Sequence, residues 1–254
     1  MDTHLYSGRI VGPGALCRMD ERFLASLAGR DGMRAAIAGA CLTTLAGSAV
    51  YGFAFGLWRA PLQGFYSAVK LPGVLFGVVL ASALVNTILA QLMGARLSFK
   101  QVCLAMLFCM AVAAALLGAV SPVVLFLALN IPGPDPAALN LPADHPVVIH
   151  SMRVFWPLLL SHVAIIGVCG VAGYVRLYRL LTRLIGAPRL ALRVLLVWLA
   201  VSGFVGCEIS WLFSPFLCKP NFEPHFITRT YHEGNFYEQM RRGIQSLGEE
   251  RPWE

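Results

Sequence analysis

Long apolar runs separated by short polar segments dominate the chain and predict membrane-spanning helices. Each run reaches or exceeds the roughly 20 residues that an α-helix needs to cross the core of a bilayer. The runs cover Ala35–Leu57, Leu71–Met93, Val102–Leu129, Val154–Val175 and Val194–Phe216. The pattern predicts an all-α fold, a polytopic transmembrane helical bundle of five spans that occupies residues 35–216.

Polar segments at both ends of the chain carry amphipathic helical patterns. Residues 1–34 form a polar N-terminal segment, in which Met19–Gly29 repeats apolar residues at helical spacing. Residues 217–254 form a polar tail that ends in a second such pattern, with Phe236, Met240, Ile244 and Leu247 on one side. We expect both helices to lie at the membrane interface.

Proline and charge mark the ends of several spans. Trp58-Arg59-Ala60-Pro61 closes the first span, and a connector of about a dozen residues leads to Lys70, where the second begins. The third run is too long for one upright helix, so we interpret Val123–Leu129, after Ser121-Pro122, as an interfacial extension or a kinked outer end. The proline-rich residues 130–153 predict an exposed loop.

Arginines fill the connector between the fourth and fifth spans, at positions 176, 179, 183, 189 and 193. The same connector carries an apolar stripe of Leu180, Leu181, Leu184 and Ile185, which predicts a basic interfacial helix. The arginines could attract anionic lipid headgroups, but a positive flank on the inner side of the membrane is the simpler account.

The distribution of basic residues predicts the orientation. With the N-terminus inside, the inner segments hold 5, 2 and 5 Lys and Arg residues, the outer connectors hold 2 and 1, and the tail holds 5. The tail also holds six acidic residues, which offset its basic ones. This asymmetry favours a cytoplasmic N-terminus and a C-terminus on the opposite side.

Glycines line one span. Gly167, Gly170 and Gly173 follow one another at three-residue spacing in the fourth run. Small residues allow helix backbones to approach closely within a bilayer. We therefore expect these three glycines to pack against a neighbouring span.

Four polar residues fall at similar depth in the apolar runs and form a candidate intramembrane site: Tyr51, Ser121, His162 and Glu208. Helical rise places Glu208 about 22 Å from the inner boundary of the core and His162 about 12 Å from the outer one. An acid and an imidazole at that depth could exchange a proton or meet a cation. In the alternative, both are structural, with Glu208 snorkelling or binding a backbone donor freed by Pro215, and Asn86 is an interhelical hydrogen-bond partner.

Composition supports the membrane assignment and excludes several classes of function. Hydrophobic residues make up 57% of the chain and charged residues only 13%. The net charge of +7 is spread over short loops, which argues against nucleic acid as a partner. The sequence contains no motif for a cofactor, a catalytic centre or a metal site, and His145 and His150 lack clustered partner ligands. The cysteines form no CxxC pair or disulfide framework.

The fifth span and the tail carry a recognisable pattern. It consists of Phe204-Val-Gly206-Cys-Glu-Ile-Ser-Trp211, then Ser214-Pro215-Phe216, and later Gly234-Asn235-Phe236-Tyr-Glu. This pattern resembles the C-terminal motif, roughly FVGxQLSWxLRPF followed by GNFYE, of a group of uncharacterised bacterial five-span membrane proteins. Glu208 stands where that group has glutamine, and Ser214 where it has arginine. The five-span layout is also distantly similar to that of Yip1-type membrane-organising proteins.

The resemblance implies a multi-pass protein of a bacterial inner membrane. We expect a non-enzymatic scaffold or accessory subunit that sits in the lipid bilayer and associates with other membrane protein subunits or with its own copies. Two alternatives stay open. One is a transporter or channel component that uses Glu208 and His162, and the other is a lipid-modifying enzyme with His145, His150 and Glu208 on one side of the membrane.

Overall fold

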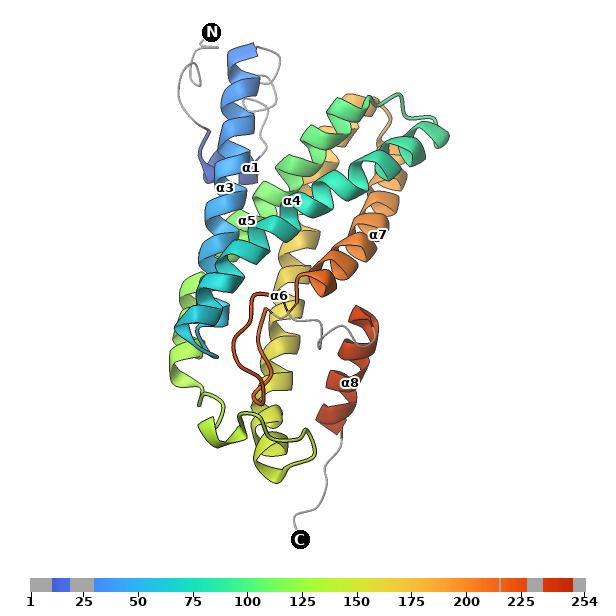
Figure 1. Ribbon diagram of the computed structural model, residues 1–254. Helices are drawn as coiled ribbons and strands as arrows, with labels where there is room; N and C mark the ends of the chain where they lie inside the picture. Colours follow the sequence, from blue (N-terminus) through green and yellow to red (C-terminus); the bar gives the residue numbers. More distant parts are fainter. Residues whose placement is uncertain (1–10, 19–29, 215, 228–234, 249–254) are drawn as a thin grey trace. The chain divides into compact units, whose positions relative to one another are not determined.

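The computed structural model describes residues 11–18, 30–214, 216–227 and 235–248, and all regular structure in these ranges is helical (Figure 1). The five long helices are α3 (Arg30–Gly56), α4 (Pro61–Leu92), α5 (Phe99–Asn130), α6 (Pro146–Ile185) and α7 (Pro188–Leu212). The shorter elements are α1 (Pro13–Arg18), the 3-10 turn η1 (Pro136–Ala138) and α8 (Phe236–Gly248). The predicted all-α class is confirmed.

All five long helices have the length and composition of membrane spans. Many of their large apolar side chains are exposed, among them Leu80, Leu84, Leu92 and Phe126. Exposed apolar surface of this extent is unfavourable in water and favourable against lipid. The chain is therefore a multi-pass membrane protein, as the sequence predicts.

The chain divides into two compact units. The first unit comprises Met1–Ser48, Pro72–Ala119 and Gly167–Gly206, and the second comprises Ala49–Leu71, Val120–Ile166 and Cys207–Glu254. Each of the five long helices contributes residues to both units. Every contact described below lies within one unit.

Two predicted connectors turn out to be helical. Helix α4 begins at Pro61 rather than near Leu71, because proline is well suited to the first turn of a helix and the residues after it continue the pattern. Helix α6 runs without interruption from Pro146 to Ile185 and so includes the last residues of the predicted loop 130–153 (Figure 1). The predicted basic segment is divided between the last part of α6 and the start of α7. Helix α6 ends at Gly186, whose φ of 73° is accessible to glycine without strain.

The predicted outer end of the third span, after Ser121-Pro122, is a continuation of helix α5. Pro122 lies inside the helix, and residues 123–129 form its last turns before Asn130. A proline removes one backbone hydrogen bond, whereas leaving the helix in an apolar environment would expose many more backbone groups. Continuation is therefore the less costly solution.

The apolar stripe of the basic segment faces the protein rather than the interface. Leu177, Leu180 and Leu181 are buried in the first unit, and only Leu184 of the predicted stripe is clearly exposed. The arginines of this segment are exposed instead. The periodicity identified an amphipathic helix correctly but did not reveal that its apolar side packs on other helices.

Close helix packing occurs mainly at glycines outside the predicted set. A Cβ at Gly47 would overlap the carbonyl oxygen of Ala114 in the first unit, and one at Gly56 would lie 2.6 Å from the carbonyl oxygen of Gln63 in the second. At Gly173 a Cβ would lie 2.6 Å from the carbonyl oxygen of Cys109.

At Gly167 and Gly170, by contrast, an added Cβ would meet nothing within 4 Å. The expected packing is thus found at Gly173 alone of the three predicted glycines. Three-residue spacing leaves successive glycines about 60° apart around the helix, so Gly167 and Gly173 point about 120° apart and do not meet the same neighbour.

The C-terminal amphipathic helix is present as α8. Asn235 caps it, because its side-chain oxygen accepts a hydrogen bond of 2.9 Å from the backbone N–H of Glu238. Gly243 packs on α6, where a Cβ would lie 2.9 Å from the ring of Trp156. The predicted N-terminal helix at Met19–Gly29 lies outside the described residues.

Candidate functional site

A polar stripe runs along the start of α4 in the second unit. It consists of Arg59, just before the helix, and Gln63, Ser67 and Lys70 in its first turns. Spacings of four, four and three residues place these side chains on one face of the helix. Gln63, Ser67 and Lys70 are all buried, with Lys70 only 1% exposed. A stripe of buried polar groups in an apolar helix requires polar partners.

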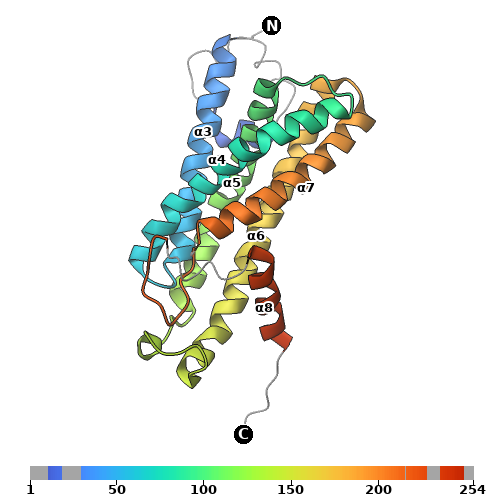
Figure 2. The ribbon, with the colours of Figure 1, turned by 45° about the vertical axis from the view of Figure 1, so that its right-hand side comes forward.

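The partners are backbone carbonyl groups of the segment that follows α7. The carbonyl oxygen of Phe216 accepts hydrogen bonds of 2.9 Å from Nε2 of Gln63 and 2.5 Å from Oγ of Ser67. Nη2 of Arg59 donates to the carbonyl oxygen of Phe222 at 2.8 Å and lies 3.5 Å from that of Pro220. We call residues 216–227 the docked segment; Figure 2 shows it beside the turn between α3 and α4.

Lys70 contacts the docked segment through two aromatic rings. Its Nζ lies 5.0 Å from the ring centroid of Phe226 and 5.9 Å from that of Phe216. A cation over the face of an aromatic ring is stabilised by about 0.5–2 kcal/mol, with the larger value where water is excluded. The ring of Tyr66 meets that of Phe226 edge-on at 5.5 Å. Charge and aromatic packing therefore hold the same segment that the hydrogen bonds hold.

The docked segment is also fixed internally and against the loop that follows α5. Nδ2 of Asn221 donates to the carbonyl oxygen of Leu141 at 3.3 Å, and the carbonyl oxygen of Asn221 accepts from the N–H of Asn140 at 3.0 Å. The buried thiol of Cys218 donates to the carbonyl oxygen of Glu223 at 3.0 Å. These contacts give a nonhelical segment a defined shape.

The end of the docked segment faces outward. Glu223, His225, Phe226 and Ile227 are exposed. Nδ1 of His225 lies 2.6 Å from the carbonyl oxygen of Glu223, which closes a tight turn. An acid, an imidazole and two apolar side chains are thus displayed together on an ordered backbone.

The predicted intramembrane site is assembled only in part. The hydroxyl of Tyr51 is hydrogen-bonded to Nδ1 of His162 at 2.8 Å, and both residues are buried. The ring of Phe55 lies against His162 with centroids 3.7 Å apart. Ser121 is buried in the same unit.

Glu208 lies apart from this pair. It is partly exposed, and among the described residues it makes no hydrogen bond or ion pair to His162. Its neighbours are Cys207, the preceding residue of α7, and Tyr237 of α8. The pKa of the Tyr237 phenol is raised by desolvation and by the nearby Cys207 and Glu208 groups. Depth along a helix indicates which residues share a layer, but it does not indicate which way each side chain points.

The residues of the C-terminal pattern have distinct positions. Phe204 is exposed, whereas Gly206 and Trp211 are partly exposed and Pro215 lies outside the described residues. Phe216 supplies the carbonyl group at the centre of the docking contacts, and Asn235 and Phe236 are the cap and first residue of α8. The pattern thus covers the end of α7, the first residue of the docked segment and the start of α8, and it does not include Tyr51 or His162.

Polar residues of the first unit connect helix to helix. Nδ2 of Asn86 in α4 donates to Oγ of Ser202 in α7 at 3.0 Å. Nε1 of Trp198 donates to the backbone carbonyl of Asn86 at 2.9 Å, and the hydroxyl of Tyr174 in α6 donates to that of Trp198 at 3.3 Å. The structural role predicted for Asn86 matches this arrangement.

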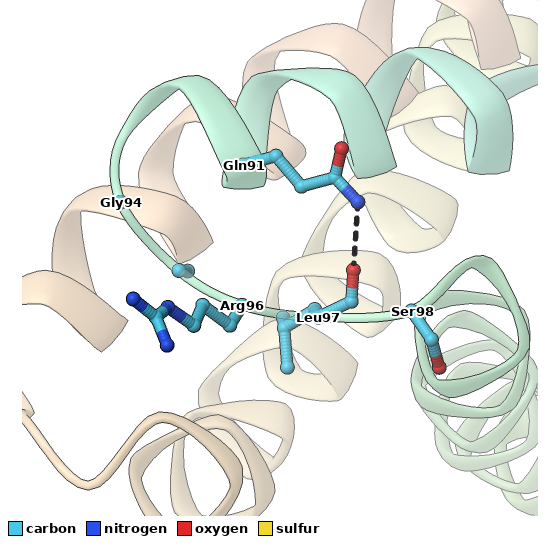
Figure 3. Close-up of a pocket in the computed structure, with 6 residues that line it drawn as sticks. Gln91, Gly94, Arg96, Leu97 and Ser98 are labelled. Atoms are coloured by element: carbon cyan, nitrogen blue, oxygen red, sulfur yellow. Dashed lines mark hydrogen bonds between the residues drawn. The ribbon is translucent and has the colours of Figure 1, made fainter.

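A surface pocket lies at the turn between α4 and α5, also in the first unit. Its volume is ≈ 560 Å³, and it is lined by Gln91, Gly94, Ala95, Arg96, Leu97 and Ser98. Figure 3 shows the amide of Gln91 donating to the carbonyl oxygen of Leu97, a bond of 3.2 Å, while the side chain of Arg96 points away from it. The pocket is thus a recess of a tight turn, with one cationic side chain at its edge.

Sequence reasoning missed the polar stripe of α4, although a signal for it exists. Arg59, Gln63, Ser67 and Lys70 recur at helical spacing, which would have been visible had residues 61–70 been treated as helix. Arg59, Gln63 and Ser67 bond backbone carbonyl groups, which carry no signal in the amino-acid sequence.

Within the described ranges, no group of three or more His, Cys, Asp or Glu side chains could hold a metal ion. No protein-family model, curated protein or solved structure matches this chain.

Proposed function

We propose that this protein is a non-enzymatic scaffold or accessory subunit of a larger membrane assembly, and that the docked segment is the surface it presents to a partner. The observation that carries the proposal is the hydrogen bonding of Gln63, Ser67 and Arg59 to the backbone of residues 216–222.

Ordering a nonhelical segment is costly. Fixing the backbone of each residue opposes folding by about 1–2 kcal/mol. Most contacts that offset this cost use backbone carbonyl groups, and Phe226 adds its ring contacts with Lys70 and Tyr66. They fix the shape of the segment while leaving Glu223, His225 and Ile227 available at its end. A preorganised surface of this kind lowers the entropic cost of binding a partner.

The proposed setting is a bacterial inner membrane with the N-terminus in the cytoplasm. Five spans place the two chain ends on opposite sides, and the excess of arginine in the N-terminal segment and between α6 and α7 favours the cytoplasm for those parts. The docked segment and α8 would then face the periplasm. The proposed partners are other membrane protein subunits, or further copies of this chain, that expose a surface on that side.

Co-purification after mild detergent extraction tests the scaffold role. The wild-type protein should be isolated with a defined partner or as a defined homo-oligomer. An Arg59→Met/Gln63→Leu variant should lose that association, because the docked segment is released. Asn86→Leu, which alters a buried polar side chain of the first unit, should keep it. A wild-type monomer without any partner would contradict the proposal, and so would equal association of all three proteins.

A second candidate function is supported by the buried hydrogen bond between Tyr51 and His162. Such a pair can take part in proton transfer, so a transporter or channel component is the alternative proposal, with Glu208 and His162 as its ionisable groups. Proton flux into liposomes under an imposed pH gradient tests it, with Glu208→Gln and His162→Leu as variants. Flux that both variants leave unchanged would remove this role, as would the lack of flux with the wild-type protein.

A further inference from the structure

The start of α7 presents two parallel stripes to the outside of the first unit. One consists of Arg189 and Arg193, and the other of Leu192 and Leu196; all four side chains are exposed. Residues four apart lie on the same face of a helix, so each stripe follows the helix axis. The leucines extend further along the helix into the apolar span.

The opposite face of the same helix is buried. Ala191, Val194, Leu195 and Trp198 pack inside the first unit. This packing fixes the rotation of α7, so the arginines cannot turn inward. Among the described residues, neither Arg189 nor Arg193 makes a hydrogen bond or an ion pair.

The last part of α6 also exposes arginines next to an apolar side chain. Arg176, Arg179 and Arg183 are exposed at spacings of three and four residues, and Val175 beside them is exposed as well. Arg179 donates a hydrogen bond of 3.3 Å to the backbone carbonyl of Arg18 at the end of α1. The first unit therefore gathers five exposed arginines on the consecutive helices α6 and α7.

Acidic residues that could neutralise this charge are scarce. The segments 72–119 and 167–206 contain no aspartate or glutamate, and Asp31 is the single acid among the described residues of the first unit. Within the described residues of the first unit, the five arginines thus face a single acidic side chain, and this excess of positive charge favours an anion bound from the surroundings. At the end of a membrane span, phosphate groups of lipids are the most abundant anions.

We propose that this surface binds an anionic phospholipid. The guanidinium groups of Arg189 and Arg193 hold the headgroup phosphate, and one acyl chain lies along Leu192 and Leu196. Guanidinium matches phosphate through paired hydrogen bonds, and the adjacent apolar stripe distinguishes a lipid from a soluble anion. A general role of the arginines in setting orientation would not require any lipid preference in the purified protein. The inference does not depend on the proposed scaffold role.

The test uses the full-length protein in neutral detergent and two lipid probes with identical acyl chains, phosphatidylglycerol and phosphatidylcholine. The wild-type protein should bind phosphatidylglycerol more tightly. Arg189→Gln/Arg193→Gln should weaken that binding about 10- to 30-fold, since each basic residue near a membrane surface contributes about 1 kcal/mol. Arg189→Lys/Arg193→Lys should retain only part of it, because lysine keeps the charge but not the paired hydrogen bonds of guanidinium. An unchanged melting temperature in phosphatidylcholine would show that the variants are folded.

Arg241→Gln/Arg242→Gln is the matched control, because it removes the same charge from α8. It should change the affinity for phosphatidylglycerol less than about threefold, because these residues lie outside the proposed surface. Inorganic phosphate at equal ionic strength should not displace the lipid. Equal affinity for the two lipids, an equal loss in the control variant, or full displacement by inorganic phosphate would each overturn the proposal.

Discussion

Helix α4 uses its buried polar side chains in different ways in the two units of this protein. In the first unit, Asn86 and Ser202 join one transmembrane helix to another through their side chains. In the second unit, Gln63 and Ser67 donate to the backbone carbonyl of Phe216, which belongs to a nonhelical segment. The same helix, α4, contributes to both arrangements.

The difference separates contacts that join helices from contacts that hold a nonhelical segment in place. Helices satisfy their own backbone hydrogen bonds, so polar links between them add only modest stability. A nonhelical segment cannot satisfy its backbone carbonyl groups through a regular helix, so beside apolar helices these groups depend on hydrogen-bond donors from other parts of the chain. Substitutions of Arg59 and Gln63 should therefore release a segment, whereas a substitution of Asn86 should only loosen a helix contact.

The largest effect is expected where helix backbones meet. Gly47→Val should destabilise the first unit by about 2–4 kcal/mol, because the new side chain overlaps the carbonyl oxygen of Ala114. Thermal unfolding in detergent measures this effect. Gly167→Val is the matched control, since a Cβ there would meet nothing within 4 Å. Equal melting temperatures for the two variants would contradict the packing described.

Release of the docked segment is the next effect in size. In Arg59→Met/Gln63→Leu, chymotrypsin should cleave after Phe222 about 10- to 100-fold faster, because hydrogen bonds involving charged groups contribute about 1.5–3 kcal/mol each. Helical content by circular dichroism should stay the same. Wild-type rates of cleavage in the double variant would mean that these side chains do not hold the segment.

A smaller effect is expected at the Tyr51 and His162 pair. Tyr51→Phe removes the hydroxyl that bonds Nδ1 of His162 and should cost about 1 kcal/mol, within the range measured for hydrogen bonds between membrane helices. Equilibrium unfolding in mixed micelles measures the change. A Tyr51→Phe protein as stable as the wild type would show that the bond contributes nothing.

The smallest effect is expected for Asn86→Leu. The amide of Asn86 bonds Ser202, but its Oδ1 is buried without a hydrogen-bond partner, and the bond from Trp198 uses the backbone carbonyl, which the variant keeps. The variant loses the hydrogen bond to Ser202 but also removes the unsatisfied buried oxygen, and these two effects nearly cancel. We therefore expect the free energy of unfolding to change by less than about 1 kcal/mol in the same experiment. A loss of several kcal/mol would show that this contact organises the first unit.

The sequence was sufficient to predict the class of fold and the number of spans, because apolar length and helical period are local properties. It also predicted the amphipathic helix that the structure shows as α8. It failed at Pro61, where the helix begins earlier than predicted, and it left open the form of the outer end after Pro122, which the tertiary and lipid surroundings decide.

The candidate site was less predictable. Tyr51 and His162 were assigned to one layer by depth and do meet, whereas Glu208 was assigned to the same layer and lies near Tyr237 instead. The docking contacts of α4 could not be predicted, since their acceptors are backbone carbonyl groups far along the chain.

The most direct test of the proposed scaffold role is photo-crosslinking from position 227, at the exposed end of the docked segment, in native membranes. A photoreactive amino acid at this position should give one defined cross-linked product. The product should disappear when Arg59→Met/Gln63→Leu releases the segment and persist with Asn86→Leu. No defined product from the wild-type background, or the same product after release of the segment, would contradict the account.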